Sequence, residues 1–157
     1  MPTNAKHHID GAQREKQLIF FGTDGIRGKA ETILTNELVR KIGFWTSFVL
    51  QKQGPILIGQ DSRTSSQRIV HALTSGLHSQ DREVWLLGLC PTPALPYLIK
   101  KYNAGGGLMI SASHNPPEWL GMKIKGPFGG SVEGDFTKSV EKRLASGIKF
   151  VPLKSKT

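Results

Sequence analysis

Three short apolar runs, nearly continuous rather than alternating, recur along the middle of the chain. They occupy residues 56–58, 84–87 and 108–110. Continuous apolar runs of this length are typical of strands that pack against other elements on both faces. The pattern therefore predicts three buried, parallel strands.

Two amphipathic stretches separate these runs and predict helices. Residues 66–80 and 93–102 each place apolar side chains at helical spacing: Ile69, Leu73 and Leu77 in the first, and Leu95, Leu98, Ile99 and Tyr102 in the second. Thr64 and Gln67 have the spacing of a capping box for the first helix, and the Gly105-Gly106-Gly107 run is expected to end the second. Strand and helix alternate, which predicts two βαβ units.

The flanking segments extend this pattern in both directions. Thr35 is expected to cap a helix with an apolar stripe of Leu38, Ile42, Trp45 and Val49. Residues 121–125 predict a further strand, and Phe136, Val140 and Leu144 mark a last helix. The expected fold is α/β, a three-layer α/β/α sandwich with a mostly parallel sheet.

The length of 157 residues suits one globular domain. We expect residues 1–17 to form a flexible tail, residues 18–146 the α/β domain, and residues 147–157 a linker to further domains.

Composition narrows the function classes. The net charge of +9 would suit an anionic ligand, but the cations are scattered and no nucleic-acid motif is present, so a phosphorylated small molecule is favoured over nucleic acid. The single cysteine, Cys90, follows an apolar run and is interpreted as structural. No apolar run is long enough to span a membrane, and no signal peptide is seen at the start, so a cytoplasmic location is expected.

Polar residues follow the predicted strands where ligands bind in such sheets. Because the carboxyl ends of parallel strands share one edge, Asp61, Cys90 and residues 111–113 should lie together there. The segment GGGLMISASHNP carries Ser113 out of a strand into a polar loop, which could also be a simple turn. A serine hydrolase is disfavoured because no G-x-S-x-G elbow is present, whereas phosphoryl transfer needs the positive charge that nearby basic residues could supply.

Four motifs together resemble the phosphohexomutase family. FGTDGIRG, GQDSR, SASHNP and GMKIK occur in the family's order, over about residues 21–144. This is the first of four domains in such enzymes, and the motifs resemble the phosphoglucosamine mutase branch most. The resemblance implies a phosphohexomutase domain I-like fold.

The resemblance also implies roles for individual residues. Ser113 matches the serine that is phosphorylated and passes the phosphoryl group to the sugar, and His114 matches the adjacent catalytic histidine of the phosphoryl site. Lys123 and Arg27 match basic residues that assist proton transfer and orient the phosphoryl group. Asp61 and Arg63 of GQDSR are expected to brace the loop under Ser113 rather than to act directly.

The magnesium site of the family is expected to be incomplete in this chain. The phosphoryl group on Ser113 is itself a Mg²⁺ ligand in the family, but the D-G-D-x-D-R carboxylates of the second domain are absent here. The expected partners are a phosphosugar substrate and acidic metal-binding and sugar-binding domains.

The expected function is interconversion of glucosamine 6-phosphate and glucosamine 1-phosphate through a phosphoserine, with the chain inactive alone. One alternative is a phosphomannomutase or phosphoglucomutase domain. Another is a non-catalytic module that binds anions or a partner.

Overall fold

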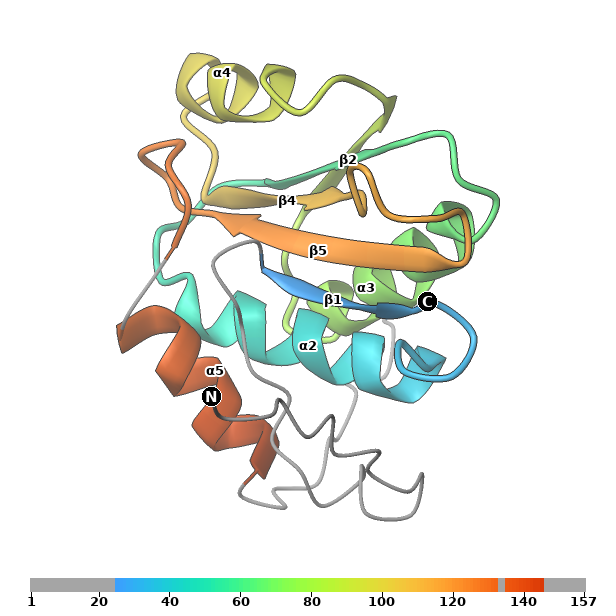
Figure 1. The fold of residues 1–157 in the computed structure, drawn as a ribbon. Helices are drawn as coiled ribbons and strands as arrows, with labels where there is room; N and C mark the ends of the chain where they lie inside the picture. Colours follow the sequence, from blue (N-terminus) through green and yellow to red (C-terminus); the bar gives the residue numbers. More distant parts are fainter. Residues whose placement is uncertain (1–24, 133–134, 146–157) are drawn as a thin grey trace, which may run out of the picture.

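A computed structural model describes residues 25–132 and 135–145 of the chain. In these residues a five-stranded sheet lies between two layers of helices (Figure 1). The strands are β1 (Ile26–Lys29), β2 (Ile56–Gln60), β3 (Val84–Leu89), β4 (Gly106–Ile110) and β5 (Trp119–Lys125). The helices are α2 (Asn36–Val49), α3 (Ser66–His78), α4 (Ala94–Lys101) and α5 (Asp135–Ala145). This arrangement confirms the predicted three-layer α/β/α fold.

The strands lie across the sheet in the order β1-β5-β4-β2-β3. β2 pairs in parallel with both β3 and β4, which confirms the two predicted βαβ units. β5 lies between β4 and β1 and is antiparallel to both. Four strands therefore run in one direction and β5 runs in the other, so the sheet is mostly parallel.

The main hydrophobic core fills the face of the sheet that carries α2, α3 and α5 (Figure 1). α2 begins as predicted, because the Thr35 hydroxyl accepts a hydrogen bond from the Leu38 amide at 3.2 Å. α2 and α3 cross closely: a Cβ atom added at Gly76 would lie 2.0 Å from the Arg40 carbonyl oxygen. Glycine is therefore required at this crossing.

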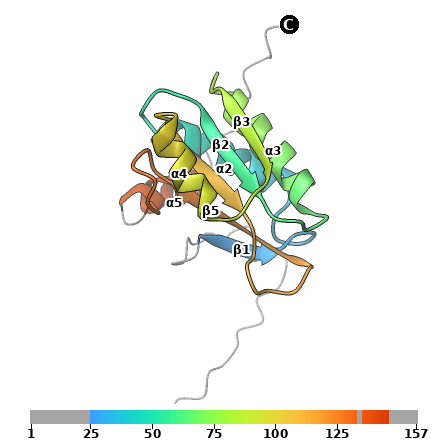
Figure 2. The ribbon, with the colours of Figure 1, turned by 90° about the horizontal axis from the view of Figure 1, so that it is seen from above.

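The opposite face has a smaller core under α4. Leu95 and Ile99 of α4 pack with Leu57 and Met109 of the sheet, and Ala104 completes the buried cluster. α4 covers only part of this face and leaves β1 outside its cover (Figure 2). Within the part of the chain that the structure describes, no helix covers the β1 side of this face.

β3 corrects one expectation about burial. Its continuous apolar run predicts cover on both faces, but β3 is an edge strand. Trp85, Leu86 and Leu89 are exposed, Leu89 to 72%. Only part of β3 contacts the two cores, because among residues 25–132 and 135–145 no further strand pairs with its outer edge.

Two predicted helix signals were wrong, although both helices lie close to their predicted bounds. The cap position of α3 is Ser65 rather than Thr64, its side chain makes no capping hydrogen bond, and the Ser66 amide closes a turn onto the Arg63 carbonyl at 3.1 Å. α4 ends at Lys101, before the glycine run, and Gly106 and Gly107 begin β4. In that strand Gly107 leaves room for Leu95 and Ile99 of α4.

Several expectations fall on residues that the structure does not describe. The tail at residues 1–17, the linker at 147–157 and the side chain of Phe136 are among them. In α5, Val140 is buried and Leu144 packs against the main core, as predicted. No helix in the described part of the chain is long and apolar enough to cross a membrane.

Candidate functional site

The carboxyl ends of the three parallel strands meet at one edge of the sheet, as predicted. The Asp61 amide donates to the Ile110 carbonyl at 3.0 Å, and the Cys90 amide donates to the Gln60 carbonyl at 3.2 Å. The residues that follow β2, β3 and β4 are therefore neighbours. The segment from Ser111 onward leaves the sheet at this edge.

Ser113 lies in a tight turn directly after β4. The backbone amide and side-chain amide of Asn115 both donate to the Ala112 carbonyl, at 3.0 and 2.9 Å, and close the turn. Ser113 has a φ of +54°, in the left-handed region that L-residues rarely adopt. Ser113 and His114 are both exposed, so both can be reached from solvent.

Arg63 fastens this turn to the end of β2. Its two terminal nitrogens donate to the Ser113 carbonyl at 2.8 Å and to the Pro116 carbonyl at 2.6 Å, while its Nε pairs with Asp61 at 2.9 Å. The GQDSR motif therefore braces the Ser113 loop, as the sequence predicted.

Asp61 is the anion that pairs with Arg63 and holds it in place. Partial burial would raise the pKa of Asp61, but hydrogen bonds from the Ser66 hydroxyl, the Arg63 amide and side chain, and the Ser111 hydroxyl lower the pKa below its usual value. The Ser66 contact is 2.8 Å. Asp61 is thus a charged acceptor whose contacts all serve the structure of the loop.

Strand register places Arg27 and Lys123 on the same face of the sheet. Arg27 of β1 pairs with Gly121 of β5, and Lys123 pairs with Met109 of β4. Directly paired residues, and residues two apart on one strand, point to the same side. Arg27 and Lys123 therefore share the α4 side with Ser111, which lies two residues beyond Met109.

Gly121 makes room for this arrangement. A Cβ atom added there would lie 2.7 Å from the Ser111 carbonyl oxygen and 3.0 Å from Cγ of Arg27. The Arg27 side chain thus lies directly over Gly121, beside the segment that leads to Ser113. Because Gly121, the first residue of the GMKIK motif, has no side chain, the aliphatic part of the Arg27 side chain can lie close to the sheet.

The same face carries two further cations that the sequence prediction did not single out. Alternation along β1 and β5 places Lys29 and Lys125 on the side of Arg27 and Lys123. Lys125 donates to the Ser131 hydroxyl at 2.8 Å. Burial, and then the charge of Lys123, lower the pKa of Lys125. The open part of this face is therefore strongly cationic.

The described residues do not provide a complete metal site. Residues 25–132 and 135–145 contain no group of three or more His, Cys, Asp or Glu side chains placed to hold a metal ion. Cys90 is half-buried, and burial raises the pKa of its thiol despite the bond with Gln60. A raised pKa and partial burial do not favour a reactive thiol at Cys90. We therefore consider the hydroxyl groups and cations near Ser113 as the candidate chemical groups.

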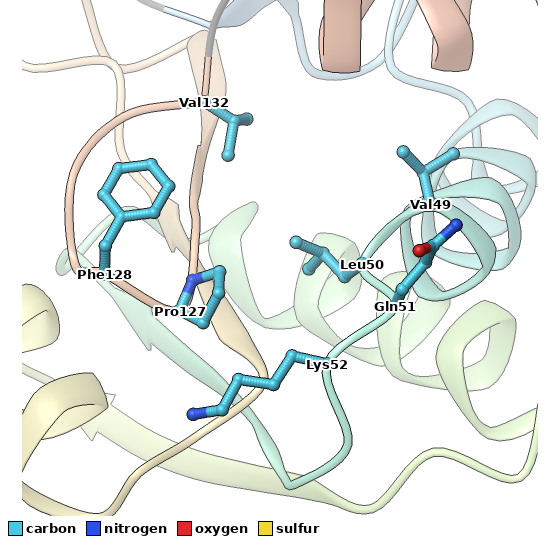
Figure 3. A pocket seen from close by; sticks show the side chains of 7 residues that line it. All are labelled: Val49, Leu50, Gln51, Lys52, Pro127, Phe128 and Val132. Carbon is cyan, nitrogen blue, oxygen red and sulfur yellow. The ribbon is translucent and has the colours of Figure 1, made fainter.

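An apolar pocket of about 300 Å³ lies away from these residues, at the opposite edge of the sheet. It is formed between the end of α2 and the turn after β5, as Figure 3 shows. Its lining residues are Val49, Leu50, Gln51, Lys52, Pro127, Phe128 and Val132. Lys52, the charged member, donates to the Asn103 side chain at 2.5 Å, and its position does not connect with the Ser113 loop.

The arrangement is suited to handling a phosphoryl group. An exposed hydroxyl is held on a braced turn, and cations from two neighbouring strands lie on the adjoining face. Phosphoryl transfer depends on positioning and on neutralising charge at the equatorial oxygens. The left-handed backbone of Ser113 was not expected, because glycine, asparagine and aspartate are the usual signals for it.

Comparisons with known proteins agree on the family. Residues 18–149 match the family model described as phosphoglucomutase/phosphomannomutase, alpha/beta/alpha domain I. A phosphoglucosamine mutase from Prochlorococcus marinus is 64% identical over 79% of this chain and 27% of its own length. A phosphoglucosamine mutase from a Synechococcus species is 53% identical over 82% of this chain and 28% of its own length.

The fold is shared with a solved structure as well. A phosphoglucomutase/phosphomannomutase family protein from Burkholderia thailandensis aligns with a TM-score of 0.70 and 26% identity. The alignment covers 82% of this chain and 30% of that protein. The chain thus spans about a quarter to a third of the length of the relatives that it matches.

Proposed function

Because the chain belongs to the phosphoglucomutase/phosphomannomutase family, we propose that it is the phosphoserine-bearing domain of a phosphoglucosamine mutase. In this proposal Ser113 carries the phosphoryl group between the 6-hydroxyl and the 1-hydroxyl of glucosamine. The observation that carries the proposal is the placement of Ser113: an exposed hydroxyl on a braced turn beside the face that holds Arg27 and Lys123.

Each transfer exchanges one P–O bond for another. The bond between phosphorus and Ser113 Oγ breaks as phosphorus bonds to a sugar hydroxyl; the sugar hydroxyl gives up its proton to a base, and Ser113 Oγ takes up a proton as it departs. In the return step phosphorus at the other end of the sugar bonds to Ser113 Oγ, which loses its proton, and the departing sugar oxygen takes up a proton. We assign charge neutralisation to Arg27 and His114 and proton transfer to Lys123.

We place the remainder of the active site outside the described residues. Ser113 would supply one Mg²⁺ ligand through its phosphoryl group, and Mg²⁺ prefers an octahedral shell of oxygens, so this one ligand would not make a site. The described residues therefore do not fit a resident magnesium ion by themselves. The proposal assigns the carboxylates, and the groups that bind the sugar, to partner domains. It also includes a cytoplasmic location for the reaction.

A chimera tests this proposal directly. Residues 18–149 of this chain replace the matching segment of the 64% identical Prochlorococcus relative. The purified chimera should convert glucosamine 6-phosphate to glucosamine 1-phosphate, and the 157-residue chain alone should not. A folded chimera without turnover, or magnesium-dependent turnover by the chain alone, would contradict the proposal.

The same chimera tests substrate specificity only in part, because in our proposal other domains also bind the sugar. A phosphomannomutase or phosphoglucomutase parent is the second candidate, favoured by the family model, whose description names both activities. Swapping residues 18–149 into a phosphomannomutase as well would show whether this domain alters the preference for glucosamine phosphate.

A further inference from the structure

A ring of polar contacts holds both backbone polar groups of Ser113. The Ser113 amide donates to the Ser111 hydroxyl oxygen at 3.1 Å, and the Ser113 carbonyl accepts from Arg63 at 2.8 Å. Nε of Arg63 pairs with Asp61 at 2.9 Å. The Ser111 hydroxyl is one of the groups that lower the pKa of Asp61, so the electrostatic influence of Ser111 on Asp61 completes the ring.

We propose that Ser111, Asp61 and Arg63 are positioning residues that fix the backbone of Ser113 in its left-handed conformation and so aim its hydroxyl. The proposal rests on the proposed function only for the role of Ser113 as phosphoryl carrier. The three residues act through Ser113 and have no assigned contact with the sugar.

The conformation of Ser113 needs such support. Left-handed backbone brings Cβ of an L-residue too close to its own carbonyl group, so it is uncommon outside glycine, asparagine and aspartate. The other two non-glycine residues with positive φ in the described chain are Asp81 and Asn103, which are of the tolerated types. Ser113 is exposed, so side-chain packing does not impose its conformation. Besides the bonds from Asn115 that close the turn, the polar ring restrains the backbone of Ser113 itself.

Arg63 is suited to this task in a way that lysine is not. Its three nitrogens point to three acceptors at once: Asp61, the Ser113 carbonyl and the Pro116 carbonyl. Its side chain is only 13% exposed and its contact with Asp61 is partly buried, whereas its bonds to the two carbonyls are exposed. A lysine ammonium is a single point charge and cannot reproduce the planar fork. The Arg63→Lys variant should therefore behave like a loss rather than a rescue.

The positively charged side chains near Ser113 have two different roles. Arg63 is committed to backbone carbonyls and to Asp61, whereas Arg27 and Lys123 reach the adjoining face from β1 and β5. Removing Arg63 should thus disturb the geometry of Ser113 while leaving the cations of that face in place. This predicts a loss in kcat with little change in KM.

Backbone NMR on the 157-residue chain tests the ring without reference to activity. Arg63→Gln, Arg63→Lys and Ser111→Ala should each lower the amide order parameters of residues 113–114 from about 0.85 to below about 0.6. Arg82→Gln is the matched control, because Arg82 also binds backbone carbonyls, those of Ser47, Leu50, Lys52 and Gly54, but far from Ser113. It should leave the signals of Ser113 unchanged.

The chimera then gives the catalytic readout. Arg63→Lys in the chimera should lower kcat by about 10²-fold, as expected for a misplaced reacting group, with KM within about twofold of its original value. Unchanged order and chemical shifts at Ser113 in both Arg63→Lys and Ser111→Ala would overturn the ring as a positioning device. Full kcat in Arg63→Lys would do the same. A chimera that is inactive before any substitution would instead count against the proposed function, while the NMR result still decides the role of the ring.

Discussion

The two faces of the sheet serve different purposes. The face under α2, α3 and α5 holds a cluster of eighteen buried core residues, whereas the described cluster under α4 holds five. The larger core accounts for most of the apolar burial that stabilises the fold. The smaller core leaves part of its face open, and this open part carries Arg27 and Lys123 next to the Ser113 turn. Stability and chemistry are thus separated across the thickness of a single sheet.

The sharpest way to test this separation is to shorten one leucine in the main core and one outside it. Leu73 of α3 is fully buried in the main core, whereas Leu86 of β3 is 59% exposed. Leu73→Ala should lower the free energy of unfolding by about 2–5 kcal/mol, because it removes buried methyl groups and leaves a cavity. Leu86→Ala should change it by no more than about 0.5 kcal/mol. Urea denaturation of both variants measures the difference, and similar losses would contradict the comparison.

A methyl group at Gly121 should disturb the open face without touching the main core. The added Cβ atom would lie 2.7 Å from the Ser111 carbonyl oxygen and 3.0 Å from Cγ of Arg27. Gly121→Ala should therefore cost about 1–3 kcal/mol, as overpacking does, and displace Arg27 from its place beside Ser111. In the chimera, Gly121→Ala should lower turnover by more than the fraction of protein that thermal melting shows to be unfolded at the assay temperature. Normal turnover in a folded Gly121→Ala chimera would argue against the assigned role of Arg27.

The sequence predicted the elements of this fold better than their surroundings. The Thr35 cap was predicted, because a capping side chain and the amide that it binds are three residues apart. The exposure of β3 was not, because a run such as VWLLGL looks the same at an edge and in the middle of a sheet. The Thr64 capping box failed because the turn at Arg63 is held by Asp61, and this contact overrides local spacing.

In the candidate site, too, the sequence predicted the residues better than the contacts around them. Motif resemblance pointed to Ser113, Arg27 and Lys123, and strand order places β1, β5 and β4, which carry or lead to them, side by side in the sheet. The antiparallel direction of β5 could not be derived from GMKIK, yet it determines which residues of β4 and β1 lie beside Lys123. The positive φ of Ser113 is supported by local bonds from Asn115 and to Ser111 and also by Arg63, fifty residues away, and this distant contact has no local signal in the sequence.

Acidification should weaken the brace at Ser113 through Asp61. The pKa of Asp61 is lowered in the folded chain, so its contribution to stability is complete above the unfolded pKa, near 4, and is lost as pH falls through the folded pKa. Asp61→Asn should thus cost about 1–2 kcal/mol at pH 7 and progressively less below about pH 4. Denaturation at pH 7 and pH 3 measures this, with the exposed Glu31→Gln as the control. An equal cost of Asp61→Asn at both pH values would contradict the account.

The smallest effect on stability is expected at the reactive residue itself. Ser113 is exposed, and the ring holds its backbone rather than its hydroxyl. Ser113→Ala should therefore change the free energy of unfolding by no more than about 1 kcal/mol. A thermal melt of the 157-residue chain checks this value. A larger loss would mean that the hydroxyl has a structural role.

The central claim, that Ser113 carries the phosphoryl group, is tested most directly by a phosphosite map of the active chimera. Mass spectrometry should find phosphate on Ser113, and Ser113→Ala should abolish both phosphate incorporation and nearly all turnover. Ser111→Ala should keep phosphate on Ser113 and retain partial turnover, because Ser111 supports the loop without carrying the group. Phosphate on Ser111, or an active Ser113→Ala chimera, would contradict the account.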